Sequence, residues 1–197
     1  MIGSVRLVGY EQARVRLAAI GRNVDPVVRG ALNAAATAAR REMYMRKMLG
    51  TFMRRQFLND RMKIKRANTK RLNARVIPSS SGVLVLNYKT WGFDPINETR
   101  AVIWVRGVNG KKVAAGFVNP SSKGKLPWAT RSTKRTTSRS GKARNYRYEW
   151  DQRRLAMGPS VAYWFRQLSG AATINWTNAF LQQEFERRIR REIAKYH

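Results

Sequence analysis

The hydrophobic positions of residues 10–60 recur at the spacing of helices. Within residues 10–22, apolar side chains lie three and four positions apart, which predicts a short amphipathic helix. Asp25-Pro26 then gives an N-cap residue followed by proline at the first helical position, a typical start for a second helix. That helix has an alanine-rich surface, which permits close approach of a neighbouring element, and Gly50 is expected to end it. A further short helical turn is expected over residues 52–58.

The middle of the chain has the short apolar and alternating runs that are typical of strands. One of them, residues 83–88, is apolar on both faces, so we expect cover on both sides of that strand. Asn109-Gly110 is a strong hairpin-turn signal between two further runs, and Pro78 to Gly82 predicts another turn. The expected strands are Leu72–Ile77, Val83–Tyr88, Ala101–Arg106 and Val113–Val118.

The last third of the sequence changes from polar and basic to helical. Residues 119–148 contain no acidic residue and have the composition of a long exposed loop. Apolar positions then form one stripe over residues 161–168 and a longer stripe over residues 174–196. Glu184/Arg188 and Glu186/Arg190 are set four residues apart with the acid first, which is the favourable order on a helix.

These patterns predict an α+β fold. We expect a small antiparallel sheet of three or four strands, packed against an N-terminal and a C-terminal pair of helices, with a long basic loop. The predicted organisation is a single domain over residues 1–197: helices over about 10–60, the sheet over about 72–118, the loop over 119–148 and the C-terminal helices over about 160–196.

The net charge of the chain indicates what kind of function to expect. The chain of 197 residues has 40 Lys and Arg against 11 Asp and Glu, a formal net charge of +29, although its 26% of charged residues is ordinary. With 43% hydrophobic residues and many aromatics it can bury a core, unlike a disordered basic tail. So strong an excess of one sign repels itself unless a negatively charged partner offsets it, and it therefore predicts a binding protein.

Composition argues against most catalytic chemistry. The sequence has no Cys, and its one His is His197, which excludes zinc knuckles, thiol nucleophiles and His-based sites. Asp94, Glu98, Glu149 and Asp151 are the acids weighed as a metal-dependent nuclease centre, and their spacing gives that hypothesis little support. We expect no enzyme activity, catalytic residue, metal, cofactor or small-molecule substrate. No apolar run approaches the roughly 18–20 residues that span a bilayer, and the N-terminus lacks the apolar core of a signal peptide, so no membrane contact is expected.

Two basic segments are the candidate binding sites. Both are rich in Arg, whose planar guanidinium suits phosphate and carboxylate alike, so residue type alone does not choose between nucleic acid and an acidic protein surface. In the second segment, aromatic side chains alternate with the cations and are candidate interface anchors. The first segment comprises Arg61, Lys63, Lys65, Arg66, Lys70, Arg71 and Arg75. The second comprises Lys123, Lys125, Arg131, Lys134, Arg135, Arg139, Lys142, Arg144 and Arg147, with Trp128, Tyr146 and Tyr148 as anchors.

Five short segments, in this order, resemble the minor tail protein Z family, the tail completion proteins of long-tailed bacteriophages. The resemblance extends over nearly the whole chain. This chain departs from the family in the loop after Asn119, which is longer and richer in Arg, Trp and Tyr than the family's pattern implies. The segments are Gly9-Tyr10-Glu11-Gln12-Ala13, the alanine-rich stretch Ala31 to Ala35, the basic run Ile64 to Val76, Gly116-Phe117-Val118, and Leu155 to Val161 with its Gly-Pro-Ser turn before a helix.

The resemblance implies a structural virion protein, assembled in the host cytoplasm, at the head-proximal end of the tail. It would complete the tail and enable head–tail joining. The implied partners are tail tube or tail terminator proteins and head–tail connector or portal proteins, and identical copies would form a homo-oligomeric ring. Docking would be electrostatic and hydrophobic, through the basic segments, onto acidic rims of these proteins or onto DNA in the lumen. The family is similar to this chain in carrying no catalytic residues.

One alternative class remains open from composition alone. A nucleic-acid-binding protein, such as a ribosome-associated or chromatin-like basic factor, would have the same charge. The two classes differ in salt dependence, because a phosphate binder loses affinity with a log–log slope of about −0.9 per phosphate contacted, whereas a hydrophobic ring interface persists.

Overall fold

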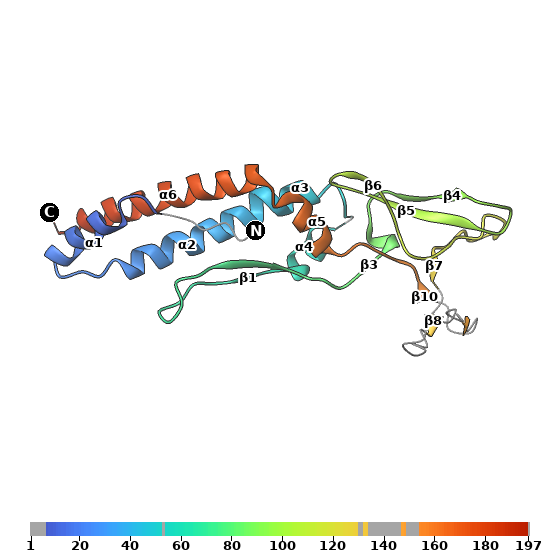
Figure 1. Ribbon diagram of the computed structural model, residues 1–197, viewed down its shortest axis with the longest axis horizontal. Helices are drawn as coiled ribbons and strands as arrows, with labels where there is room; N and C mark the ends of the chain where they lie inside the picture. The colour runs from blue at the N-terminus through green and yellow to red at the C-terminus, as the bar shows by residue number, and fades with distance from the viewer. Residues whose placement is uncertain (1–6, 53, 130–131, 134–146, 149–153, 197) are drawn as a thin grey trace, which may run out of the picture. The chain divides into compact units, whose positions relative to one another are not determined.

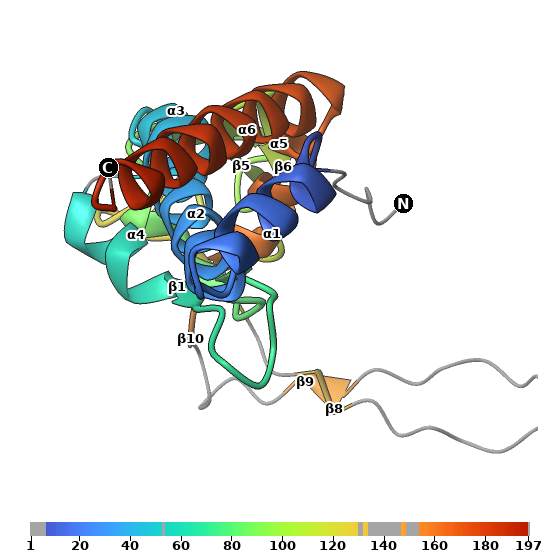
Figure 2. The ribbon, with the colours of Figure 1, turned by 90° about the vertical axis from the view of Figure 1, so that its left-hand side faces the viewer.

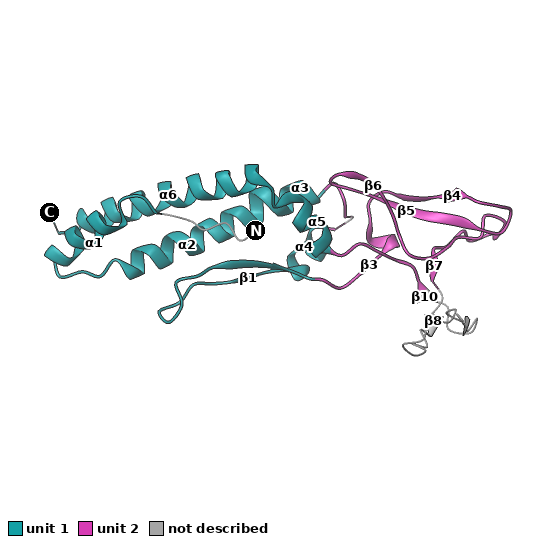
Figure 3. Ribbon diagram, viewed as in Figure 1, with its two compact units in different colours: residues 1–49, 55–79, 161–197 teal, residues 50–54, 80–160 magenta. Residues whose placement is uncertain are grey.

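The computed structural model describes residues 7–52, 54–129, 132–133, 147–148 and 154–196 (Figure 1). The chain divides into two compact units, coloured separately in Figure 3: residues 1–49, 55–79 and 161–197 form unit 1, and residues 50–54 and 80–160 form unit 2. Helices and small antiparallel sheets of two or three strands make up both units together, which confirms the α+β class. The single domain over residues 1–197 stays a prediction.

Unit 1 is mainly helical. Its long elements are α2 and α6, which pack along each other, and α1 closes one end of the pair. The chain continues without a break from α2 through a π-helical turn, η1, into α3, and the helical run ends before Gly50 as expected. The elements are α1 (Tyr10–Ala19), α2 (Asp25–Ala39), η1 (Arg40–Met45), α3 (Arg46–Met48), α4 (Arg55–Arg61), β1 (Met62–Lys65), β2 (Arg75–Pro78), α5 (Val161–Leu168) and α6 (Ala171–Ile193).

Small side chains on α2 let α6 approach closely. Ala31 and Ala35 are buried in one apolar cluster with Leu181 and Phe185 of α6, and Leu17 of α1 joins the same cluster. Alanine loses no side-chain entropy on burial and does not disturb the helix, so this surface is both helix-forming and apolar. The predicted alanine-rich contact surface is confirmed.

Two predicted helix ends differ from the structure. Asp25 is the first residue of α2 and Val24 its N-cap, so the expected N-cap is wrong by one position, although Pro26 does lie in the first turn. The short helix expected over 52–58 lies instead at α4, Arg55–Arg61.

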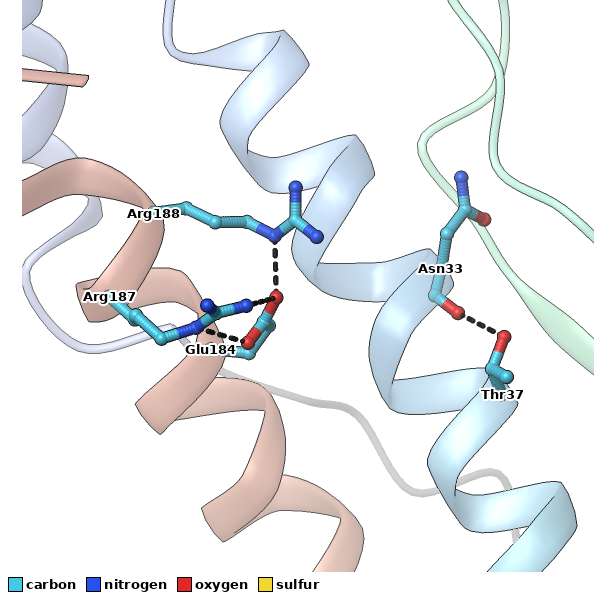
Figure 4. Close-up of polar contacts among 5 residues, drawn as sticks. All are labelled: Asn33, Thr37, Glu184, Arg187 and Arg188. Carbon is cyan, nitrogen blue, oxygen red and sulfur yellow. Dashed lines mark hydrogen bonds and ion pairs between the residues drawn. The ribbon is translucent and has the colours of Figure 1, made fainter. Parts of the chain in front are cut away.

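A charged cluster on α6 lies against α2 (Figure 4). Glu184 is 8% exposed and accepts hydrogen bonds from Arg187 (2.8 and 2.9 Å) and Arg188 (2.7 Å). A Cβ at Gly30 of α2 would overlap the Arg188 guanidinium, so glycine at this position makes room for that side chain. The hydrogen bonds from Arg187 and then Arg188 hold the pKa of Glu184 below its ordinary value.

Replacing Glu184 by Gln is expected to destabilise the fold by about 1–2 kcal/mol at neutral pH, since the two arginines lose a buried charged acceptor but are themselves partly exposed. Because its pKa is lower in the folded chain, the Glu184 carboxylate stabilises the fold above the unfolded pKa of about 4.3. That contribution is lost as the pH falls through the lowered pKa, so the difference between E184Q and the wild type should shrink in acid. Urea unfolding at several pH values, followed by helical circular dichroism, measures this.

The matched control is E186Q on the same helix. The Glu186 side chain is 49% exposed and lies 3.7 Å from Arg190, so its loss should change the free energy of unfolding by less than about 0.5 kcal/mol. Equal losses in the two variants, or a loss in E184Q that is the same in acid, would contradict the assignment.

Unit 2 consists of short strands around a β-rich core. β4, β5 and β6 form its three-stranded sheet, and β5 alternates buried Ala101, Ile103 and Val105 with half-buried residues. The other pairs are β3 with β11, β7 with β10, and β8 with β9. The bounds are β3 (Val83–Leu84), the 3-10 turn η2 (Val85–Asn87), β4 (Trp91–Pro95), β5 (Ala101–Gly107), β6 (Gly110–Val113), β7 (Trp128–Ala129), β8 (Ser132–Thr133), β9 (Arg147–Tyr148), β10 (Arg154–Leu155) and β11 (Met157–Gly158).

The predicted Asn109-Gly110 hairpin is confirmed as the connection between β5 and β6, with Gly110 at φ +97°. Beyond β6, the chain continues beside β5 through single bridges, among them Ala101 with Val118. Gly116 has φ +132°, and a Cβ there would overlap the carbonyl oxygen of Trp128 and the side chain of Ala156. This position in Gly116-Phe117-Val118 therefore requires glycine.

Four expectations about the strands and the loop were wrong. The strand expected over 113–118 is not formed, since β6 ends at Val113 and the residues after it make only single bridges. The strand expected over 72–77 begins only at Arg75 and includes Pro78. The strand expected over 83–88 stops at Leu84, because the backbone turns into η2, and Leu84 and Leu86 are half-buried. Residues 119–148 are not wholly a loop, since β7, β8 and β9 lie within them.

Candidate functional site

The candidate site is the basic hairpin, residues 62–78, in which β1 pairs with β2. The register places Lys63 opposite Ile77 and Lys65 opposite Arg75. Since side chains alternate between the two faces of a strand, these four share one face, and all four are exposed. The other face, which Met62 and Val76 share, is buried or half-buried.

An asparagine shapes the tip of the hairpin. The Asn68 side-chain oxygen accepts the backbone N–H groups of Lys70 (3.1 Å) and Arg71 (2.9 Å), and the backbones of Asn68 and Arg71 bond to each other. This local turn fixes the backbone that carries two of the predicted cations. Arg66, Lys70 and Arg71 are all exposed there.

Two polar side chains of the α2–η1 helix hold the hairpin. Asn33 donates to the carbonyl oxygen of Ala67 (3.1 Å) and accepts the Ala67 N–H (2.8 Å). Arg40 donates from Nε to the carbonyl oxygen of Met62 (2.7 Å) and from Nη2 to Asn59 (3.1 and 3.2 Å). Figures 1 and 2 both show α2 between α6 and the hairpin. The basic face is thus presented on a fixed support.

The charge on the hairpin differs from the charge on the helices. On α1, η1 and α6, arginines pair with carboxylates, as in Glu11–Arg14, Glu42–Arg46 and Glu186–Arg190. Within the described part of the chain, no carboxylate pairs with a hairpin cation; Arg75 bonds instead to the Asn73 amide oxygen at 2.8 Å. Lys65 and Arg75 also lie directly opposite each other, where like charges destabilise a strand pair. A bound anion would relieve this repulsion.

The other predicted site residues lie elsewhere. Arg61 ends α4, with its guanidinium 4.7 Å from the centre of the Phe57 ring. Lys123 and Lys125 are exposed in unit 2, and half-buried Trp128 lies in β7 opposite Leu155. Arg147 and Tyr148 form β9, of which only the backbone is described. The remaining residues of the second segment lie outside the described residues: Arg131, Lys134, Arg135, Arg139, Lys142, Arg144 and Tyr146.

Sequence reasoning missed the two supporting residues, Asn33 and Arg40. The one available signal was chemical: asparagine is a poor helix former, so its place inside an alanine-rich helix calls for a polar partner. Nothing in the spacing indicated that the partner would be the backbone of Ala67.

The described residues contain no group of three or more His, Cys, Asp or Glu side chains that could hold a metal ion. Asp94, one of the acids weighed as a nuclease ligand, instead accepts hydrogen bonds from Lys111 (2.6 Å) and Trp104 Nε1 (3.0 Å). The bond from Lys111 lowers the pKa of Asp94. No described helix has both the length and the apolar character to cross a membrane.

No family model, no curated protein and no solved structure matches this chain. The resemblance to the minor tail protein Z family therefore stays a prediction, resting on the segments quoted above.

Replacing Asn33 by Ala is expected to free the hairpin from α2, because the Ala67 N–H and C=O groups lose both partners. Leaving a buried backbone donor unpaired costs about 1–3 kcal/mol, so amide hydrogens over residues 62–78 should exchange about five- to a hundredfold faster. Hydrogen exchange followed by mass spectrometry measures this.

The control is T37A, one turn along the same helix, where the Thr37 hydroxyl only donates to the Asn33 carbonyl oxygen (2.8 Å; Figure 4). Exchange in the hairpin should be unchanged in T37A. If N33A leaves hairpin exchange at the wild-type rate, the two hydrogen bonds do not hold the hairpin.

Proposed function

We propose that this protein is a structural virion protein that completes the head-proximal end of a phage tail and makes it competent to join the head. It acts by binding and has no enzyme activity. Identical copies are arranged as a ring in the virion, where they contact tail tube or terminator proteins on one side and connector or portal proteins on the other.

The observation that carries the proposal is the basic hairpin: a set of exposed cations that have no carboxylate partner among the described residues, on a backbone fixed by Asn33 and Arg40. A binding element that is already ordered loses little conformational entropy when it docks. Unpaired charge on such an element also speeds association with an oppositely charged surface. Both properties suit a subunit that must find and close a joint between two large particles.

Contacts within the chain also support the tail assignment. The stretches Ala31 to Ala35 and Ile64 to Val76, which carry much of the family resemblance, meet through Asn33 and Ala67. Gly158-Pro159-Ser160 directly precedes α5, as the resemblance implies, and Tyr88 donates a hydrogen bond to the Pro159 carbonyl oxygen. The resembling segments thus have structural roles, which is what a shared fold would require.

Docking of the hairpin involves electrostatic attraction first and apolar contacts afterwards. The hairpin cations approach an acidic rim, and exposed apolar side chains then exclude water from the contact. Trp128, Tyr146 and Tyr148 remain the predicted anchors for a second contact in unit 2.

Reversing the charge of three hairpin residues, K65E/K70E/R71E, should leave the protein folded but block head–tail joining in a phage that encodes it. All three side chains are exposed, so folding has no need of them. We expect separate filled heads and unjoined tails by electron microscopy, and a loss of infectious particles of at least about a hundredfold, which corresponds to losing a few charge-assisted contacts.

The control is R16E/K47E/R191E, which makes the same change in net charge at exposed positions outside the hairpin. It should assemble normally. Normal joining by K65E/K70E/R71E would exclude the hairpin as the docking element. If instead the wild-type protein is found bound to nucleic acid in cells, released by salt with the slope of a phosphate binder, and absent from virions, the nucleic-acid-binding alternative replaces the proposal.

A further inference from the structure

The exposed face of the basic hairpin is not purely charged. Ile77 is 47% exposed and lies opposite Lys63 on the same face as Lys65 and Arg75. Leu72, at the start of the return from the tip, is 40% exposed. The side chains available to a ligand on this face are therefore three cations with an aliphatic residue at one end.

Another copy of the chain fits this face poorly. A second copy would have to offer carboxylates, yet six of the eleven acids already form ion pairs within their own chain: Glu11, Glu42, Asp94, Glu184, Glu186 and Glu192. Between Asp60 and Asp94 the sequence has no acid at all. Two copies of a chain with a net charge of +29 therefore repel each other at this face.

Nucleic acid also fits this face poorly. Single-stranded nucleic acid binds where aromatic side chains stack on bases, and residues 58–87 contain no Phe, Tyr or Trp. A duplex presents phosphates to cations, but it gives Ile77 and Leu72 no apolar surface to cover them. A protein interface, by contrast, usually combines apolar and charged contacts.

We propose that the hairpin face binds an extended acidic segment of a partner protein in which every second side chain faces the hairpin, and these are in turn a carboxylate and an aliphatic side chain. This inference rests on the proposed function and names the chemistry of the partner's contact. Arg75 and Ile77 are two positions apart on β2, so their side chains are about 6.6 Å apart on one face. Side chains two positions apart in an extended segment also share one face and have the same spacing. A carboxylate of the segment that meets Arg75 and Lys65 therefore places an aliphatic side chain, two positions along, over Ile77.

Two synthetic octapeptides test the proposal, together with a short DNA duplex. One peptide repeats Glu-Ser-Val-Ser and is called Glu-Val, and the other repeats Glu-Ser-Ser-Ser and is called Glu-Ser. The peptides carry the same charge and differ only in apolar surface. The full-length protein should bind Glu-Val about tenfold more tightly than Glu-Ser, as expected from partly burying one or two aliphatic side chains. Fluorescence anisotropy at several salt concentrations measures all three affinities.

Variants separate the two contributions. In I77S the preference for Glu-Val should fall to about twofold or less, while the affinity for Glu-Ser is kept. In K65E/R75E binding of both peptides should be lost. V113S is the matched control, because Val113 is a 62% exposed aliphatic residue of β6 in unit 2, and it should behave as the wild type.

Equal binding of the two peptides, tighter binding of the duplex than of Glu-Val, or no peptide binding would each overturn the inference. These failures differ from failure of the proposed function. If K65E/K70E/R71E blocks head–tail joining but the peptides bind equally, the docking role stands and the partner chemistry is wrong. If Glu-Val binds as expected but the triple variant assembles normally, the binding site stands and the tail role is wrong.

Discussion

Helix α2 makes two kinds of contact on opposite sides, and the basic hairpin depends on both. Ala31 and Ala35 allow α6 to approach, which buries the apolar cluster of unit 1. Asn33 and Arg40 are seven residues, or two helical turns, apart, so both extend from one side of the helix. That side holds the hairpin through its backbone. Without the packing on α6, the helix would not be a fixed support, and the cations would be carried by a free ribbon.

The hairpin is held to α2 and η1 through its backbone and not through its cationic side chains. Asn33 and Arg40 bond to backbone carbonyl and amide groups of the hairpin, so the cations on the exposed face take no part in holding it. On the helices, by contrast, some arginines are paired with carboxylates, as Arg187 and Arg188 are with Glu184. The six cations of residues 62–78 have no carboxylate partner among the described residues, and this is the physical basis for assigning the binding role to the hairpin.

Much of the fold could be predicted from the sequence because local patterns determine it. The stripes of α1, α2 and α6 have helical period, and Asn109-Gly110 specifies its own turn. β1 was missed because it has only four residues, and its alternation of Met62 and Ile64 with two lysines was interpreted as a charge run. The prediction of one strand over residues 83–88 was wrong for another reason. Val83 and Val85 are both buried, and buried valines are compatible with a strand and with a 3-10 turn alike.

Only the charged residues of the candidate site could be predicted from the sequence. The arrangement of these cations depends on the pairing of β1 with β2. It also depends on the bond between Asn33 and Ala67, which are more than 30 residues apart in sequence. Long-range contacts of this kind leave no periodic signal. The exposure of Ile77 beside the cations likewise depends on the strand register, and that register became visible only in the structure.

Electron cryomicroscopy of intact virions of a phage that encodes this chain tests the proposed role in the tail. We expect a ring of copies at the junction of head and tail, with residues 62–78 of each copy against an acidic segment of a neighbouring protein. Absence of the chain from that junction, or a hairpin that faces solvent in the assembled joint, would contradict the proposed role.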